Sequence, residues 1–477
     1  MFELGSYPLV RSGRFTSRNN SRAMTTRRHF LQSIGFATAG MTFLPAYMRA
    51  AAPVKFDRVR VGVIGCGLRA QEHLRECTLR PDVDVIALAD PDPLMIARSQ
   101  RTLRNGGRKE AVVYGKGNED YLNLLKRDDI DAVFICSPWE WHVPQGIAAL
   151  EAGKIVGMEV CGGMNIQECW DIVQASERTG VPVMALENVC YRRDVMAVLN
   201  MVRQGLFGEM MHLEGGYQHD LRGVKFNDGK SPYDSGVEFG EKGFSEARWR
   251  TQHSIHRNGD LYPTHGIGPV ANYIDINRGN RFTHLTSMAT KARGLHEYIV
   301  KHPKGGPDHP NANVEFRLGD VVTTMIRTSS GETVTLFHDT NLPRPYSLGF
   351  RVQGTKGIWM DVNQSIYLEG KSAKSHQWEK AEPYLQAFDH PLWKKYEQDA
   401  TGAGHGGMDF FLLHAFIECA KENAPAVIDV YDAATWMAIT PLSEESIAMG
   451  SQPVAFPDFT RGRWINRQPV FALDDRY

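Results

Sequence analysis

The sequence predicts an α/β protein in which a doubly wound parallel sheet precedes an α+β domain with an open, mostly antiparallel sheet. Two observations lead to this fold class. Short apolar β-type runs alternate with helical stretches up to about residue 190, and later β-type runs lie close together with turn residues between them. The chain has 477 residues, of which 42% are hydrophobic and 23% charged, as is typical of a folded protein with a substantial core.

The first half of the chain contains strands that are almost continuously apolar, as buried parallel strands are. Residues 58–65 form a β-rich run that ends in glycine, a helical stretch follows to about Arg80, and Val83–Asp90 is a second apolar run. The further elements are predicted strands at Ile130–Cys136, Lys154–Glu159 and Val181–Glu187 and predicted helices at His142–Ala152 and Ile166–Thr179. This order predicts a parallel sheet with helices on both faces.

The pattern changes after about residue 190. A helix is predicted from Arg193 to Gly205 and a strand over Met210–Tyr217, and loops are predicted over 300–313 and much of 366–407. An antiparallel sheet and two final helical runs are predicted from the segments 282–290, 321–328, 332–338, 348–353, 357–361, 408–423 and 431–448.

Charge and cysteine content exclude several classes of function. Lys and Arg number 54 and Asp and Glu 55, so no basic excess is present to bind nucleic acid. After residue 52 no apolar run reaches the ~20 residues of a membrane span. The 7 cysteines form no C-x-x-C pair, which argues against a disulfide framework and a thiolate zinc site. His253 and His256 form H-x-x-H without the accompanying Glu of a zinc enzyme, so no metal is expected.

The N-terminus resembles an export signal. Arg27 and Arg28 precede a modestly apolar stretch from Ile34 to Ala46, and the small residues Ala50–Ala52 follow. This layout is typical of the twin-arginine route, and it predicts a periplasmic or secreted protein. No cysteine follows the apolar stretch, so a lipid anchor is not expected. The alternative is an N-terminal helix that merely contains two arginines.

The strongest motif is Gly65-Cys66-Gly67-Leu68-Arg69-Ala70, which follows a predicted strand and opens a predicted helix. Gly65 permits a tight turn, and Gly67 lets the backbone approach a diphosphate at the helix N-terminus. Asp90 ends the second strand, where a carboxylate accepts hydrogen bonds from ribose hydroxyls and repels a 2′-phosphate. The motif therefore predicts a Rossmann domain that binds NAD rather than NADP.

Two further segments end predicted strands at the edge where this fold binds ligands. The segment Trp139-Glu140-Trp141-His142 follows the fourth strand as a predicted loop, and Glu159-Val160 ends the fifth. We expect both to line the nicotinamide half of the cofactor. For His142 alone, a surface position at a helix N-terminus is an equally good interpretation.

With these motifs in place, the chain resembles glycoside hydrolase family 109, within the superfamily of glucose–fructose oxidoreductase and inositol dehydrogenase. Family 109 enzymes depend on NAD and are typified by α-N-acetylgalactosaminidase. The resemblance runs from about 58 to about 460. It rests on the segments 159–160, 168–170, 186–191, 199–205, 216–222, 258–269, 277–279 and 404–410.

The resemblance implies which residues bind the cofactor and the sugar. NAD is expected to contact Leu68, Arg69, Asp90, Trp139, Glu140, Trp141, His142, Glu159, Val160 and Asn188 in addition to Gly65 and Gly67. The sugar site is expected at Tyr217, Arg250, Tyr262, Pro263, Thr264, His265 and Tyr346. The superfamily usually has Glu-Lys-Pro where this chain has Glu159-Val160-Cys161, which weakens a plain dehydrogenase interpretation.

The implied reaction is the hydrolysis of N-acetylgalactosaminides, expected to be α-linked, by a redox route instead of two catalytic carboxylates. The sugar is oxidised at C3, a base removes the C2 proton, the aglycone leaves, water adds, and C3 is reduced again. His265 and Tyr262 are the candidate catalytic residues, and their assignment as base or acid stays open. A histidine side chain ordinarily titrates near neutrality, whereas a tyrosine base needs a depressed pKa or a cation such as Arg250.

The N-terminal pattern and the resemblance together predict this domain order: a signal region at 1–52, an NAD-binding domain at 56–190, a substrate and oligomerisation domain at 191–460 and a tail at 461–477. Two other functions compete with the glycosidase: an exported NAD(P)-dependent sugar dehydrogenase, and an inactive sugar-binding protein that retains NAD. We expect a small-molecule or glycan substrate, no nucleic acid and no membrane anchor, and leave a homo-oligomer open.

Two groups of residues keep more than one interpretation at this stage. The aromatic side chains near the predicted sites either stack on sugar rings or belong to the core, and they are Trp139, Trp141, Trp249 and Tyr346. The turn Gly404–Gly407 with His405 is either a simple helix entry or part of a site.

Overall fold

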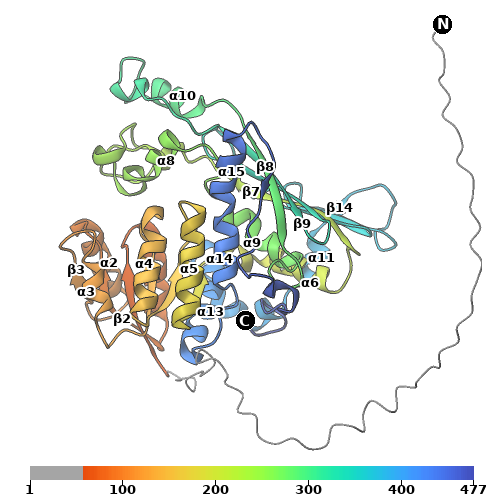
Figure 1. The fold of residues 1–477 in the computed structure, drawn as a ribbon, viewed down its shortest axis with the longest axis horizontal. Helices are drawn as coiled ribbons and strands as arrows, with labels where there is room; N and C mark the ends of the chain where they lie inside the picture. The colour runs from red at the N-terminus through yellow and green to blue at the C-terminus, as the bar shows by residue number, and fades with distance from the viewer. Residues whose placement is uncertain (1–56) are drawn as a thin grey trace, which may run out of the picture. The chain divides into compact units, whose positions relative to one another are not determined.

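The computed structural model describes residues 57–477, and the predicted export signal lies outside them. The first sheet has six parallel strands in the order β3-β2-β1-β4-β5-β6, which is the doubly wound arrangement predicted (Figure 1). Its strands are β1 (Val59–Ile64), β2 (Val83–Ala89), β3 (Val112–Tyr114), β4 (Ala132–Ile135), β5 (Ile155–Met158) and β6 (Val183–Ala185). Every residue of β4, β5 and β6 is buried, which explains why these strands are apolar throughout.

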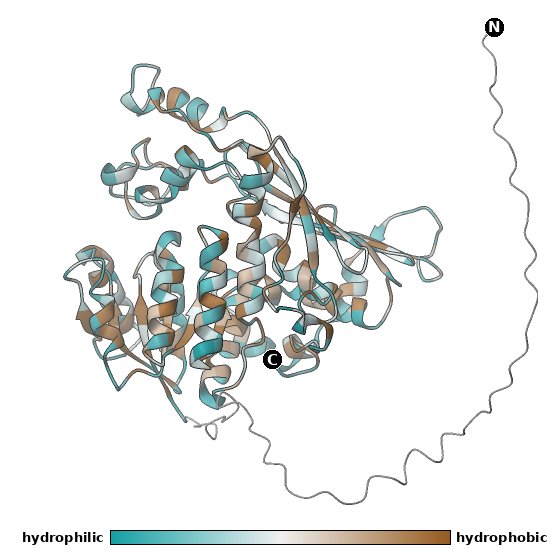
Figure 2. Ribbon diagram, in the orientation of Figure 1, coloured by the Kyte–Doolittle hydropathy of each residue, from teal (hydrophilic) through white to brown (hydrophobic). Residues whose placement is uncertain are grey.

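Helices cover this sheet, and their ends follow ordinary capping chemistry. The Asn165 side chain accepts the backbone N–H of Glu168 at the start of α5, and Gly180 in the left-handed conformation ends that helix. The helices are α1 (Leu68–Leu79), α2 (Pro93–Asn105), α3 (Tyr121–Leu125), α4 (Trp139–Glu151) and α5 (Ile166–Thr179). Figure 2 shows mainly hydrophobic strands beneath helices of mixed character.

The expectation of a loop over Trp139–His142 is wrong, because these residues form the first turn of α4. Pro138 stands at the N-cap of this helix, where its missing N–H costs no hydrogen bond.

The second sheet has nine strands in the order β14-β13-β12-β11-β7-β10-β9-β8-β15. It is mixed: its strand pairs are antiparallel except that β10 runs parallel to β7. The strands are β7 (Met210–Gln218), β8 (Phe282–Ala289), β9 (Val321–Thr328), β10 (Thr333–Asp339), β11 (Arg351–Gly354), β12 (Gly357–Met360), β13 (Ser365–Leu368), β14 (Glu379–Lys380) and β15 (Val454–Ala455). The predicted fold class is thereby confirmed.

Helices and short 3-10 turns connect these strands and close the chain. The α-helices are α6 (Arg193–Arg203), α7 (Arg222–Lys225), α8 (Arg250–His256), α9 (Thr264–Tyr273), α10 (Gly294–Lys301), α11 (Glu382–Ala387), α12 (Pro391–Ala400), α13 (Met408–Glu422), α14 (Val430–Met437) and α15 (Ile439–Ala448). The 3-10 helices are η2 (Asn188–Tyr191), η3 (Gly240–Lys242), η4 (Ser245–Arg248), η5 (Pro310–Asn313), η6 (Gly404–Gly407) and η7 (Arg463–Ile465).

The prediction of loops over 366–407 and 300–313 is only partly correct. The first segment contains most of β13 and all of β14, α11 and α12, and the second contains the end of α10 and η5. These elements give little apolar periodicity because they are short, and α11 buries none of its residues.

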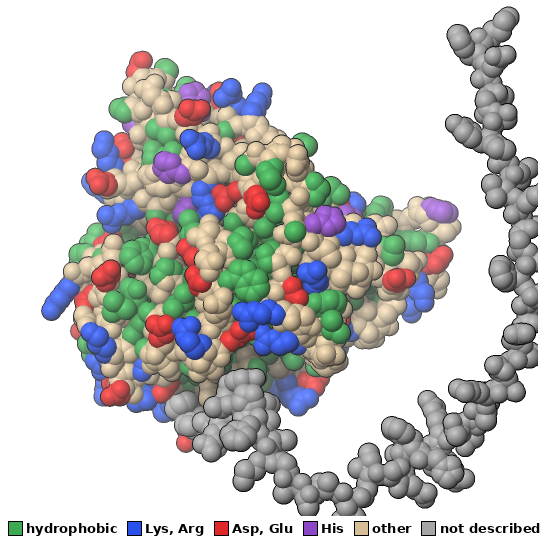
Figure 3. Space-filling view, in the orientation of Figure 1, with side chains coloured by type: hydrophobic (Ala, Val, Ile, Leu, Met, Phe, Trp, Pro, Cys, Tyr) green, Lys and Arg blue, Asp and Glu red, His purple; other side chains and the backbone are tan. Residues whose placement is uncertain are grey.

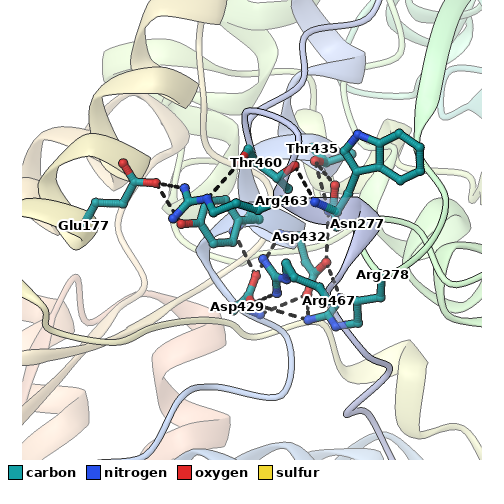
Figure 4. A network of polar contacts seen from close by, with 11 residues as sticks. Glu177, Asn277, Arg278, Asp429, Asp432, Thr435, Thr460, Arg463 and Arg467 are labelled. Atoms are coloured by element: carbon teal, nitrogen blue, oxygen red, sulfur yellow. Dashed lines mark hydrogen bonds and ion pairs between the residues drawn. The ribbon is translucent and has the colours of Figure 1, made fainter. Parts of the chain in front are cut away.

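The C-terminal helices return to the first sheet, so that α13 packs on α1 and α14 lies beside α5 (Figure 1). A polar network joins them to the tail: Glu177 of α5 pairs with Arg463, and Asp429 pairs with Arg467 (Figure 4). Glu177 also pairs with Arg461. Asp432 of α14 holds buried Arg278 through two contacts of 2.7 Å. The network therefore links α5, α14 and residues 461–467.

The surface carries both signs of charge. Figure 3 shows acidic and basic side chains interspersed on the face drawn, in keeping with a formal net charge of -1. None of the helices within residues 57–477 has the length and apolarity needed to cross a membrane.

Candidate active site

One cavity of about 750 Å³ joins the glycine turn after β1 to residues of the second sheet and of α8 and α9. Its size is that of an ordinary small-molecule site. It brings together most of the predicted residues, namely Gly65, Gly67, Leu68, Arg69, Asp90, Trp139, Trp141, His142, Glu159, Val160, Asn188, Tyr217, Arg250, Tyr262, His265 and Tyr346. The residues predicted to bind cofactor and those predicted to bind sugar therefore share one space.

Three predicted residues do not line this cavity. Glu140 directs its carboxylate toward His253, with 3.6 Å between Oε2 and Nε2. Pro263 is the N-cap of α9. Thr264 is buried, with its hydroxyl 3.7 Å from the Cys161 sulfur. Glu140 and Thr264 thus contact His253 and Cys161, which do not line the cavity either.

The glycine turn has the shape that a diphosphate requires. Gly65 has φ 84°, and a Cβ there would lie 2.4 Å from the Ser137 backbone nitrogen. A Cβ on Gly67 would meet no protein atom within 4 Å, because it would point into open space. Gly67 is also the N-cap of α1, and it has no side chain that could cap the first N–H groups of this helix. The turn and the helix N-terminus therefore fit the diphosphate of a dinucleotide.

Asp90 holds this turn together. One carboxylate oxygen accepts the Cys66 N–H at 2.6 Å and the other accepts the Asp92 N–H at 2.8 Å. Burial raises the pKa of Asp90, although both N–H groups act in the opposite direction. Its place on the cavity wall at the end of β2 fits contact with a ribose.

Arg69 lies between two buried carboxylates. Its Nε is 2.7 Å from Glu159, and its two terminal nitrogens are each 3.0 Å from Asp409. Glu159 also contacts His73 at 2.6 Å. Burial opposes the ionisation of Glu159, but Arg69 and His73 outweigh it and lower the pKa to about 2. Glu159 thus helps to hold the Arg69 side chain in place at the cavity wall. Asp409 also accepts a hydrogen bond from the Asn188 amide at 3.0 Å.

His265, in the first turn of α9, is oriented by a buried carboxylate. Its Nδ1 lies 2.7 and 2.9 Å from the two oxygens of Glu187. Glu187 is 0% exposed, and it also accepts the backbone N–H of Val189. With Nδ1 donating to Glu187, Nε2 is the nitrogen that can accept a proton from a group in the cavity.

Sequence analysis did not give Glu187 and Asp409 a role in the site. The available signal was that both lie in segments that carry the family resemblance, 186–191 and 404–410, and that Glu187 directly precedes Asn188. Asp409 lies 340 positions from Arg69 in the chain, so its contact with Arg69 depends on the fold.

Aromatic rings surround Arg250, which is itself buried. Its guanidinium lies 5.0 Å from the ring centre of Trp139, 5.7 Å from Trp249 and 5.2 Å from Tyr262. Arg250 thus supplies the cation that a tyrosine base would need beside Tyr262, but burial raises the pKa of Tyr262 well above its usual value and outweighs this charge. Tyr262 is therefore a protonated hydroxyl, which can donate a hydrogen bond or a proton.

The remaining aromatic candidates take different positions. Trp139 belongs to the buried cluster around Arg250, and its ring also packs 4.9 Å from that of His253. Tyr346 is 51% exposed at the cavity wall, and its ring lies 6.3 Å from that of Tyr217.

Within residues 57–477, no three His, Cys, Asp or Glu side chains gather as metal ligands would.

Family models match almost the whole described chain. The model of the glycosyl hydrolase 109 C-terminal domain matches residues 191–466, and that of an oxidoreductase family with an NAD-binding Rossmann fold matches residues 59–186. Among solved structures, levoglucosan dehydrogenase with NADH and levoglucosan aligns with a TM-score of 0.61 at 20% identity, over 84% of this chain and 99% of that one. An NAD-binding oxidoreductase from Klebsiella pneumoniae aligns with a TM-score of 0.62 at 18% identity, over 84% and 99%. These structures share the fold.

Two relatives are much more similar in sequence. A glycosyl hydrolase family 109 protein of Stenotrophomonas maltophilia (strain K279a) is 54% identical over 455 residues, which cover 94% of this chain and 99% of the relative. An alpha-N-acetylgalactosaminidase of Tannerella forsythia is 49% identical over 468 residues, which also cover 94% and 99%. The chain belongs to glycosyl hydrolase family 109, and it is a glycoside hydrolase that uses NAD.

Proposed function

We propose that this enzyme hydrolyses α-N-acetylgalactosaminides by transient oxidation at C3 of the sugar. The observation that carries the proposal is that one cavity is lined both by the glycine turn and by His265, whose ring the buried Glu187 orients. The Tannerella forsythia relative, an alpha-N-acetylgalactosaminidase at 49% identity, supports the choice of sugar.

The carboxylates of the cavity support a redox route. Ordinary glycosidases need two carboxyl groups, one on each side of the scissile bond. Of the carboxylates lining this cavity, Asp90 and Asp92 bind backbone N–H groups at the cofactor end. Glu159 holds Arg69, and Glu246 pairs with Arg250 at 2.7 Å. Each of the four carboxylates on the described wall is thus engaged by a backbone N–H group or an arginine, which favours a redox route over direct displacement at C1.

The chain's own residues would share the proton transfers. The glycine turn, Arg69 and Asn188 would hold NAD, whose chemistry in this site would be reversible hydride transfer at C3 of the sugar. The resulting ketone acidifies the C2 proton, and we assign its removal to Nε2 of His265. Glu187 fixes the ring orientation and stabilises the imidazolium that forms.

Tyr262 would act as the acid. Its ring centre lies 5.0 Å from that of His265, and burial keeps its hydroxyl protonated. We assign to it the donation of a proton to the departing aglycone oxygen. Removal of the C2 proton and departure of the aglycone together form a C1–C2 double bond, to which water then adds.

A panel of aryl glycosides tests this proposal. The holoenzyme should release p-nitrophenol from p-nitrophenyl α-N-acetylgalactosaminide with no net formation of NADH. NADH formed in proportion to sugar consumed, without release of p-nitrophenol, would instead identify a sugar dehydrogenase. Binding of the sugar without turnover would identify an inactive sugar-binding protein.

We also propose that the twin-arginine route exports the chain, which Arg27 and Arg28 support. Replacing both with lysine should leave the protein in the cytoplasm when cells are fractionated. Equal periplasmic amounts of variant and parent would contradict this proposal.

A further inference from the structure

The turn η6 (Gly404–Gly407) lies at the cofactor end of the cavity, far along the chain from the glycine turn. His405 is part of the cavity wall. The backbone N–H of Gly404 donates to Glu76 at 3.2 Å, and a Cβ on Gly404 would lie 3.3 Å from the Glu72 carboxylate. Both glutamates belong to α1. The turn η6 therefore lies against α1, the helix whose N-terminus fits the diphosphate.

The backbone of η6 is held in an unfavourable conformation. His405 has φ 51° and ψ 41°, in the left-handed region that residues with a Cβ rarely adopt. Gly406 and Gly407 also have positive φ, at 69° and 98°. Such conformations concentrate at functional sites, where surrounding contacts maintain them. Here the contact is a hydrogen bond from the His405 ring to buried Asp409.

Asp409 connects His405 to residues already placed in the cofactor site. It accepts the His405 Nδ1–H at 2.7 Å, and the same carboxylate holds Arg69 and Asn188. Arg69 is shared between Glu159 and Asp409, and Glu159 also contacts His73 at 2.6 Å. A protonated His405 adds a positive charge to this group beside the helix N-terminus. Such a charge would attract the anionic diphosphate of a dinucleotide.

We propose that His405 is a further cofactor-binding residue, whose protonated ring faces the diphosphate of NAD from the C-terminal segment of the chain. The ring is half-exposed toward the cavity, and its second nitrogen is available to donate a hydrogen bond. This inference rests on the use of NAD and holds whichever sugar the enzyme cleaves.

Protonation of His405 gives the proposal a pH signature. The charged groups that act on the ring are Asp409 on α13 and Arg69 and Glu72 on α1. The hydrogen bond to Asp409 raises the pKa of His405, while burial and Arg69 oppose this rise. The positive charge is therefore present below about pH 6.5 and is lost as the pH rises through the elevated pKa. NAD should accordingly dissociate faster at alkaline pH.

The test measures NAD release from diluted holoenzyme, by the NAD content of the protein after gel filtration, from about pH 6 to about pH 9. His405→Asn should release NAD about tenfold faster at the acidic end, with a flattened pH dependence, because a charge-assisted hydrogen bond is lost. His405→Lys should retain NAD across the range, because it restores a charge that does not titrate there. The matched control is His376→Asn, since His376 is exposed and also left-handed, with φ 62°.

Two outcomes would overturn the proposal. One is NAD release from His405→Asn at the parent rate over the whole pH range. The other is release from His405→Lys as fast as from His405→Asn, which would show that charge is not what retains the cofactor. Parent-like release from His376→Asn, with faster release from His405→Asn alone, would support the assignment.

Discussion

At the scale of single residues, the site depends on pairs in which a buried carboxylate orients a second side chain. Glu187 orients His265, and Asp409 orients Arg69 and Asn188. In both cases the buried member touches a residue that lines the cavity. The orientation of the cavity-lining side chain thus depends on a buried carboxylate that does not itself line the cavity.

Replacing His265 with alanine should lower kcat for aryl glycoside hydrolysis by roughly 10²–10⁴-fold, the usual contribution of a general acid or base. NAD content should stay at the parent level, because no predicted cofactor-binding residue contacts the His265 ring. The exposed His284 on β8 gives the control His284→Ala, which should change neither quantity. Hydrolysis by His265→Ala at the parent rate would remove His265 from the mechanism.

Sequence patterns identified the cavity-lining members of these pairs better than the buried ones. The glycine turn, Asp90 and the segment from Tyr262 to His265 lie within continuous motifs. Glu187 also lies in a motif, but its role depends on a contact with α9, 78 positions along the chain. The raised pKa of Tyr262 depends on burial by several distant segments, which local sequence does not encode.

At the scale of elements, two uncapped helix N-termini face the cavity. Neither α1 nor α4 has a side-chain cap, and the first residues of both line the cavity wall. The apolar strands and the long helices were predictable because burial dictates their periodicity. The segment 366–407 was not, because its strands and helices are short and partly exposed.

Asp260, in the loop between α8 and α9, should make stability depend on pH. Its carboxylate is buried, one oxygen has no partner among the described residues, and burial raises its pKa to about 7. The folded state therefore holds a proton that the unfolded state loses near pH 4, so stability falls as the pH rises between about 4 and about 7.

Asp260→Asn removes this titration. The variant should melt at a higher temperature than the parent at about pH 8 and at the same temperature at about pH 4. The exposed Asp128→Asn should shift neither melting curve. A constant difference between Asp260→Asn and the parent at both pH values would contradict the role given to burial.

At the scale of the whole molecule, the chain returns to its first sheet after building the second. The network of Figure 4 fixes this return, because Arg278, which follows α9, pairs with Asp432 of α14. Both side chains are almost fully buried, at 5% and 4% exposed. The cofactor site benefits, since Asp409 and His405 arrive with the returning segment.

Arg278→Met should lower the free energy of unfolding by about 3–5 kcal/mol, because Asp432 and its neighbour Asp429 would lose their buried partner. Urea denaturation of the holoenzyme measures this change. Arg281→Met is the control, since within residues 57–477 the polar contact of the Arg281 side chain is a long one, of 3.5 Å, to a backbone carbonyl. Equal midpoints for the two variants would show that the network does not stabilise the fold.

The central claim is that one cavity couples redox chemistry at C3 to proton removal at C2. Hydrolysis of an α-N-acetylgalactosaminide in D2O tests it most directly, because displacement at C1 alone never breaks the C2–H bond. We predict deuterium at C2 of the released sugar, and no cleavage of the 3-O-methyl glycoside, which cannot be oxidised at C3. Protium retained at C2, together with normal hydrolysis of the 3-O-methyl glycoside, would contradict the mechanism.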